Sequence, residues 1–239
     1  MVVTLEAAGQ CCRWHPVSDR HALSRVATAR ILAAAERALD ARGQFHLVLA
    51  GGNTPRQAYQ ELRAAPADWA AWHIYFGDER CLPPTDPARN SRMAGDAWLD
   101  HVAIAEHHRH PIPAELGPDE AAVRYAAVLR PVGEFDLVLL GLGEDGHTAS
   151  LFPGHDWGDA FAAPPVLAVQ GAPKAPPQRV SLSARRLSDA REVVFLVAGR
   201  EKRGAVAQWR AGARIPARAI IPAAGVDVVV ESALLPPAG

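Results

Sequence analysis

The sequence has few cysteines, almost no net charge and no long apolar run. Its three cysteines are Cys11, Cys12 and Cys81, which match neither a disulfide framework nor a zinc-binding spacing. The 25 basic residues nearly balance 26 acidic ones, so no bulk charge favours nucleic acid or an anionic membrane. No apolar run reaches the roughly 20 residues that span a bilayer, and the N-terminus does not match a signal peptide. We therefore expect a cytoplasmic protein with reduced, non-catalytic cysteines that binds neither membranes nor nucleic acid.

Length and patterning predict an α/β fold. With 239 residues, 49% of them hydrophobic, the chain has the size of one α/β domain, and we predict a single domain over residues 1–239. Apolar residues at helical spacing predict helices over 18–43, 56–65, 90–99 and 119–130. Buried strands are expected over 45–50, 72–76, 135–141, 166–169, 179–183, 192–198 and 226–230. Residues 1–17 suggest a short strand and an entry loop, and 101–113 an irregular connection. This alternation predicts a three-layer fold with a mainly parallel sheet flanked by helices.

The stretch from Phe135 to Gly154 is the most informative part of the chain. Its first half is a continuous apolar run of strand length, typical of a strand buried on both faces. Its second half crowds three glycines together with Glu144, Asp145 and His147. Loops at the carboxyl ends of strands hold the ligands of open α/β sheets. A plain glycine-rich turn is the alternative, but the combination favours a functional site.

The second candidate segment is Gly51-Gly52-Asn53-Thr54-Pro55, between a strand and a helix. Two glycines, Thr54 in the N-cap position and Pro55 in the first turn predict a loop whose free N–H groups point outward at a helix start. Such a loop binds phosphate, although an ordinary strand-to-helix connection fits the segment equally well. It is neither a P-loop nor a dinucleotide fingerprint.

Charged residues follow other predicted strands. Asp78-Glu79-Arg80 comes after one strand and forms either a solvated turn or the edge of a site. Lys202 lies near a predicted helix start, where the helix dipole disfavours a cation unless an anionic ligand is bound; a surface lysine is the alternative. Four histidines lie at positions 101, 107, 108 and 110. Their spacing matches no metal-binding motif, and we predict no metal site.

Taken together, these segments resemble the 6-phosphogluconolactonase family in order and spacing. The resemblance rests on five stretches: Leu49–Pro55, Phe76–Arg80, Gly141–Pro153, Arg179–Leu182 and Gly199–Lys202. It implies the fold of glucosamine-6-phosphate deaminase. It also implies hydrolysis of 6-phospho-D-glucono-1,5-lactone in the oxidative pentose phosphate pathway, without metal or cofactor, by a monomer or homodimer.

The resemblance also implies roles for particular residues. It makes His147 the general base, with Asp145 beside it, and places Asp78 and Arg80 in a second active-site turn. The expected contacts to the sugar phosphate come from Gly51, Gly52, Asn53, Thr54, Arg179 and Lys202. A lactone is an activated ester, so a base for water, donors for the oxyanion and a phosphate clamp are the parts that the reaction needs. Either Arg80 or a backbone N–H fits the oxyanion role.

Two positions depart from the family pattern, and two other functions stay open. Asn53 replaces a serine, which puts its side-chain contact in doubt. Arg89 replaces a small polar residue near the site, where it adds a cation or points to solvent. An isomerase–deaminase of amino-sugar phosphates would carry an acid five residues after the histidine, where this chain has Phe152. A sugar-phosphate sensor without catalysis is the other alternative, although His147, Asp145 and Asp78 are all present.

Overall fold

The central sheet is mixed, with one antiparallel edge. The computed structural model describes residues 3–7 and 9–236. Eight strands form the sheet in the order β1-β2-β11-β10-β7-β3-β4-β6. They are β1 (Val3–Ala7), β2 (Gln10–Val17), β3 (Phe45–Leu49), β4 (Trp72–Phe76), β6 (Arg109–His110), β7 (Phe135–Gly141), β10 (Ala190–Val197) and β11 (Val226–Glu231). Every neighbouring pair is parallel except β1 and β2. The mainly parallel sheet that the sequence predicts is confirmed.

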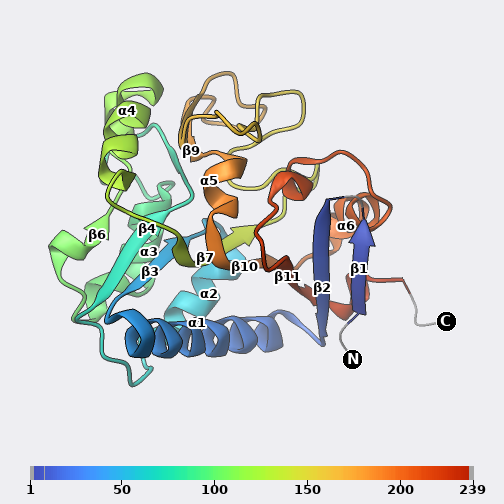
Figure 1. Cartoon of the computed structure of the whole chain (residues 1–239), viewed down its shortest axis with the longest axis horizontal. Helices are drawn as coiled ribbons and strands as arrows, with labels where there is room; N and C mark the ends of the chain where they lie inside the picture. The colour runs from blue at the N-terminus through green and yellow to red at the C-terminus, as the bar shows by residue number, and fades with distance from the viewer. Residues whose placement is uncertain (1–2, 8, 237–239) are drawn as a thin grey trace.

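Helices cover both faces of this sheet. They are α1 (Arg20–Arg42), α2 (Asn53–Leu62), α3 (Asn90–Ala97), α4 (Pro118–Leu129), α5 (Ala184–Ser188) and α6 (Arg203–Arg210). Figure 1 shows α1 and α2 along one face, and α4 and α5 on the opposite side. The three-layer architecture is therefore confirmed. Among the described residues, no helix combines the length and apolarity needed to cross a bilayer.

The first long helix shows why the sequence pattern succeeded. Asp19 is the N-cap of α1, and its carboxylate accepts the Ala22 N–H at 2.8 Å. Gly43 ends the helix with φ of 70°, a left-handed conformation that glycine adopts without strain. Between these caps Leu23, Ala27 and Ile31 lie on the buried face. The helix therefore packs its apolar stripe on the sheet, as predicted.

Three parts of the fold differ from the sequence-based prediction. Val3–Ala7 and Gln10–Val17 are two paired antiparallel strands, β1 and β2, rather than one strand and a loop. A second, antiparallel sheet joins β5 (Asp78–Arg80), β9 (Arg179–Leu182) and β8 (Val166–Val169). Within the segment 101–113, expected to be irregular, β6 adds an edge strand to β4. β5 and β6 have only three and two residues, all polar, so their pairing depends on distant partners rather than on local pattern.

Stacked histidines lie at the β6 edge of the main sheet. The His46 and His73 ring centroids are 4.9 Å apart, those of His73 and His108 are 4.0 Å apart, and His110 stacks on Tyr75 at 4.5 Å. Burial and the neighbouring imidazoles lower the pKa of His73 to about 4. Within residues 3–7 and 9–236, no three His, Cys, Asp or Glu side chains are placed to hold a metal ion. The absence of a metal from the protein stays a prediction.

This histidine stack should make the fold sensitive to mild acid. In the unfolded chain a histidine titrates near 6.5, whereas burial holds the pKa values of His46, His73 and His110 below that. Between about pH 6.5 and 4 the unfolded state therefore binds more protons, so stability falls as the pH decreases through this window. We expect a lower melting temperature at pH 5 than at pH 7.5, and a smaller difference in His73→Gln. An equal pH dependence in this variant would refute the assignment.

Candidate active site

A cavity of about 370 Å³ lies at the carboxyl ends of β3, β4, β7 and β10. The strand order reverses there, because the chain runs outward from β3 through β4 and β6 on one side, and from β7 through β10 and β11 on the other. Open α/β sheets bind ligands at such a switch point. The volume lies within the roughly 300–1,000 Å³ typical of small-molecule sites.

All ten residues predicted for the site line this cavity except Asp145. The lining includes Gly51, Gly52, Asn53, Thr54, Asp78, Arg80, His147, Arg179 and Lys202. Asp145 contacts His147 from behind. Five separate stretches of sequence therefore converge on one place. Their chemical roles are not decided by this convergence and remain proposals.

The loop after β3 places the start of α2 at the cavity. The helix begins at Asn53, with Gly52 as its N-cap at φ of 104°, and no side chain caps it. The prediction that Thr54 is the N-cap is therefore wrong. Because Gly52 adopts a φ that other residues rarely reach, the N-cap lies two residues earlier than expected. The free N–H groups of the first turn favour an anion at this end of the cavity.

Gly51 is required by close packing. A β-carbon at this position would lie 2.0 Å from Asn90 Oδ1. Asn90 in turn donates through Nδ2 to the Asp78 carboxylate at 3.0 Å and to the Asp78 carbonyl at 2.9 Å. The start of α3 therefore connects the loop before α2 with the turn after β4.

His147 is oriented by Asp145. The two atoms His147 Nδ1 and Asp145 Oδ1 lie 2.5 Å apart, and the same oxygen accepts the His147 N–H at 3.2 Å. The imidazole lies against Gly143, where a β-carbon would come within 1.9 Å of Nδ1. Burial lowers the pKa of His147, and the Asp145 carboxylate opposes that shift. The neutral ring donates Nδ1–H to Asp145, which leaves Nε2 as the basic atom.

Asp78 is held from two sides. It is 7% exposed, and its second carboxylate oxygen accepts the Ser150 hydroxyl at 2.6 Å. Ser150 follows Ala149, which has φ of 48° and is the single non-glycine residue at positive φ in the described part of the chain. Such a strained residue persists where the surrounding structure fixes it. Here it turns Ser150 toward Asp78.

The predicted cations approach the cavity in different ways. The buried Arg179 guanidinium donates to the carbonyl oxygens of Lys174, Ala175 and Pro176, each at 3.1 Å. Lys202 ends the 3₁₀ turn Arg200–Lys202 ahead of α6, and its Nζ lies 4.0 Å from Glu144 Oε1. Lys202 is therefore adaptable, whereas Arg179 also fastens the segment behind it.

Sequence reasoning missed several lining residues. Arg20, at the first turn of α1, and Lys174 both line the cavity. The positive charge of Lys174 also contributes to the lowered pKa of His147. Lys174 lies among prolines between the predicted strands 166–169 and 179–183. A basic residue five positions before Arg179 is the signal that could have found it.

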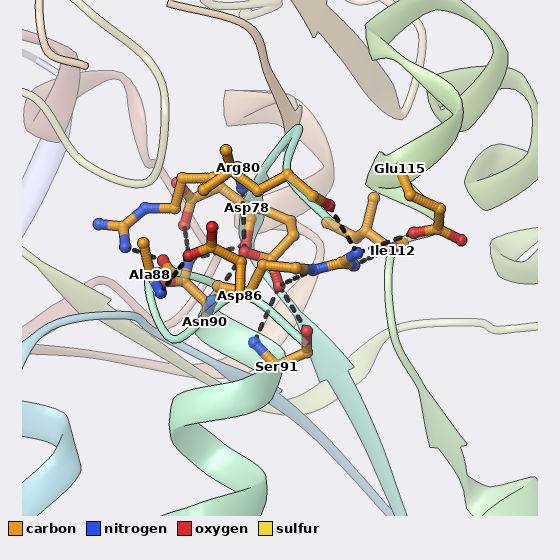
Figure 2. Close-up of polar contacts among 11 residues, drawn as sticks. Asp78, Arg80, Asp86, Ala88, Asn90, Ser91, Ile112 and Glu115 are labelled. Carbon is orange, nitrogen blue, oxygen red and sulfur yellow. Dashed lines mark hydrogen bonds and ion pairs between the residues drawn. The ribbon is translucent and has the colours of Figure 1, made fainter. Parts of the chain in front are cut away.

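Both expectations for Arg89 are wrong. Its side chain neither enters the cavity nor reaches solvent, since Arg89 is 2% exposed. Nη1 donates to Glu115 Oε2 at 2.8 Å, and Nη2 donates to the Ile112 carbonyl at 2.6 Å. Figure 2 shows Ile112 and Glu115 on one side of these polar contacts, and Asp78, Asn90 and Ser91 on the other. The physical reason is charge, because Glu79 is fully buried and Arg89 Nε lies 3.5 Å from its carboxylate.

Comparison with known proteins decides the family. Residues 18–230 match the family described as glucosamine-6-phosphate isomerases/6-phosphogluconolactonase. The chain belongs to this family. It is 37% identical over 213 residues to the 6-phosphogluconolactonase of Streptomyces coelicolor, covering 82% of this chain and 81% of that one. It is 40% identical over 181 residues to the Synechocystis 6-phosphogluconolactonase, covering 72% and 74%.

Solved structures in the 6-phosphogluconolactonase family have the same fold. The Thermotoga maritima 6-phosphogluconolactonase superposes with a TM-score of 0.85 at 25% identity, covering 92% of this chain and 100% of that one. A monomeric glucosamine-6-phosphate deaminase superposes with a TM-score of 0.80 at 18% identity, covering 92% and 98%. The latter likeness concerns the fold alone. The resemblance inferred from sequence, including its fold, is confirmed.

Phe152 occupies the position where an acid is expected in an isomerase–deaminase. Its side chain is fully buried, and its ring centroid lies 4.8 Å from that of His147. The position five residues after the histidine therefore presents an apolar ring to the imidazole. A second acid for isomerase–deaminase chemistry is not available at that position.

Proposed function

We propose that this protein hydrolyses 6-phospho-D-glucono-1,5-lactone to 6-phospho-D-gluconate, in the oxidative pentose phosphate pathway. The observation that carries the proposal is the His147–Asp145 pair, in a cavity that also holds the start of α2 and the cations Arg179 and Lys202. The names of the relatives support the same activity. A base, an oriented carboxylate and an anion site are the parts needed to open a phosphorylated lactone.

The proposed reaction uses His147 twice. Nε2 takes a proton from water as its oxygen bonds to the lactone carbonyl carbon. The tetrahedral intermediate then collapses, the bond from that carbon to the ring oxygen breaks, and the imidazolium returns the proton to the leaving oxygen. The product is a carboxylic acid, which ionises at neutral pH. Asp145 holds the ring and stabilises the transient imidazolium, as a carboxylate does in hydrolytic triads.

Phosphate binding positions the carbonyl for this attack. In the proposal, the N–H groups of Asn53 and Thr54 donate hydrogen bonds to the phosphate, which Lys202 and Arg179 also bind. Binding energy gained at the phosphate then holds the carbonyl against His147, which lowers the entropic part of the barrier. Arg80 lines the same cavity and donates to the Ala88 carbonyl. Its charge and the positive charge of Lys174 favour the developing oxyanion.

The pH dependence should report His147. The unprotonated imidazole is the active form, so kcat/KM should be constant above its pKa and fall about tenfold per pH unit below it. Because burial lowers that pKa from 6.5, the midpoint should lie on the acid side of 6.5. In Asp145→Asn the midpoint should move further toward acid, since the carboxylate that raises the pKa is gone. An unchanged midpoint in this variant would show that another group titrates.

A coupled assay tests the proposed function. Glucose-6-phosphate dehydrogenase generates the lactone, and 6-phosphogluconate dehydrogenase reports its hydrolysis as a second burst of reduced nicotinamide nucleotide. Faster formation than the spontaneous rate supports the proposal. A parallel reaction with glucosamine 6-phosphate, followed by ammonia release, tests the alternative. Ammonia release without lactone hydrolysis would overturn the proposed function, and binding of both sugars without turnover would indicate a sensor.

A further inference from the structure

Arg89 is the centre of a buried polar cluster next to the cavity. Besides Glu115 and the Ile112 carbonyl, its guanidinium donates to the Leu82 carbonyl at 3.2 Å. Its Nε faces Glu79, which is 0% exposed. The cluster therefore connects the segment 112–115 to the turn after β4 through one side chain.

The Glu79 carboxylate connects this cluster to the start of α3. One of its oxygens accepts the N–H groups of Arg80 at 2.9 Å and Asn90 at 2.7 Å. The other accepts the Ser91 N–H at 2.8 Å and the Ser91 hydroxyl at 2.7 Å. Glu79 thus satisfies the first N–H groups of α3, a place where a negative charge is favourable. Arg89 is the cation nearest to this buried carboxylate.

Asn90 completes the path to the cavity. Its backbone is fixed by Glu79, and its side-chain amide donates to the Asp78 carboxylate at 3.0 Å. Figure 2 shows Asp78 and Asn90 close together, with Ser91 below them. Removal of Arg89 would leave the Glu79 charge buried without the cation at 3.5 Å, an unfavourable arrangement that the carboxylate relieves by moving. Such a movement weakens its hold on Asn90.

We infer that Arg89 is a positioning residue that acts on the active site through Glu79, Asn90 and Asp78. This inference rests on the proposed function, because Asp78 lines the cavity in which the lactone would bind. Arg89 touches neither the cavity nor the substrate. It fixes the Asp78 carboxylate indirectly, because it holds Glu79 and Asn90 in place and connects them to Ile112 and Glu115. Misplacement of such a group by about 1 Å lowers rates about 100-fold.

A double-mutant cycle separates positioning from general support of the fold. Arg89→Met keeps the length of the side chain and removes its donors, and we expect kcat/KM to fall about 10- to 100-fold. In an Asp78→Asn background the same change should lower kcat/KM less than about threefold, since its target is already altered. Equal losses in both backgrounds would overturn the inference. The matched control is Arg92→Met on the same helix, where the arginine is exposed and paired with Asp96.

Two further measurements still test the inference if Arg89→Met folds poorly or if the lactone is not the substrate. Arg89→Lys retains a cation beside Glu79 but loses the paired guanidinium hydrogen bonds to Ile112 and Glu115. Its loss in kcat/KM should be smaller than that of Arg89→Met and should depend on Asp78 in the same way. The side-chain amide of Asn90 gives a readout independent of turnover. Its NMR signal should exchange slowly in the wild type and in Arg92→Met, and quickly in the Arg89 variants. An unchanged Asn90 signal would refute the positioning role whatever the substrate is, whereas absent lactone turnover with an altered signal would refute the proposed function alone.

Discussion

His147→Asn should lower lactone hydrolysis above the spontaneous rate by about 10²- to 10⁴-fold, the range expected when a general base is removed. Asparagine is nearly as large as the imidazole and can still accept a hydrogen bond, but it cannot take a proton from water at neutral pH. The ring of His147 contacts Gly143, Asp145 and Phe152, whereas the hydrogen bonds of Thr148 and Ser150 that hold the rest of the loop do not involve the ring. The fold should therefore survive the change, and the loss should appear in kcat rather than in KM.

His155→Asn is the matched control for this substitution. His155 is exposed, and its ring lies 6.1 Å from the ring of Phe152, which also contacts His147. It does not line the cavity, so its replacement should leave kcat within about twofold of the wild type, as for most surface changes. Near-normal turnover in His147→Asn, measured in the coupled assay with the spontaneous rate subtracted, would remove His147 from the mechanism.

The sequence predicts the large elements because their patterns are local. The helix at 20–42 has its apolar stripe in its own residues and its two caps, Asp19 and Gly43, directly beside it in the sequence. The strand at 135–141 is apolar except for Asp136 because both faces of β7 are covered. The glycines after β3 and β7 likewise identify the cavity, since close contacts at Gly51 and Gly143 leave no room for a side chain.

Features that depend on distant partners were not predictable in this way. The strand β5 has three residues, and it exists because β9 pairs with it about a hundred positions later. Arg89 is buried because Glu115 and the Ile112 carbonyl approach it from a separate segment. A polar residue in a short polar stretch predicts solvent, and only the folded arrangement supplies the acceptors that make burial favourable. Lys174 was missed for the same reason.

The structure changes how the predicted phosphate clamp should be tested. Arg179 and Lys202 both line the cavity, but Arg179 also binds three consecutive carbonyl groups from Lys174 to Pro176. Arg179→Ala would release that segment and move Lys174 as well. Its effect should therefore extend to substrates that lack phosphate. Within the part of the chain that the structure describes, the Lys202 ammonium group has one ion pair, to Glu144 at 4.0 Å, which makes it the cleaner probe.

Lys202→Met should lower kcat/KM for the 6-phosphorylated lactone about 10- to 200-fold, because a charge-assisted contact to phosphate contributes about 1.5–3 kcal/mol. The same variant should hydrolyse unphosphorylated glucono-1,5-lactone at nearly the wild-type rate, since that substrate has no phosphate to lose. Arg200→Met is the control, because Arg200 is exposed in the same 3₁₀ turn and does not line the cavity.

The comparison between the two lactones decides the assignment. The phosphate and the carbonyl are at opposite ends of the substrate, so a cation that binds phosphate acts on one lactone, and a cation that stabilises the oxyanion acts on both. Arg179→Ala, which disturbs both ends, should lose activity on both lactones, with the larger loss on the phosphorylated one. If Lys202→Met loses activity equally on the two, Lys202 acts at the carbonyl, and the phosphate must be held by the start of α2 together with another cation such as Arg20.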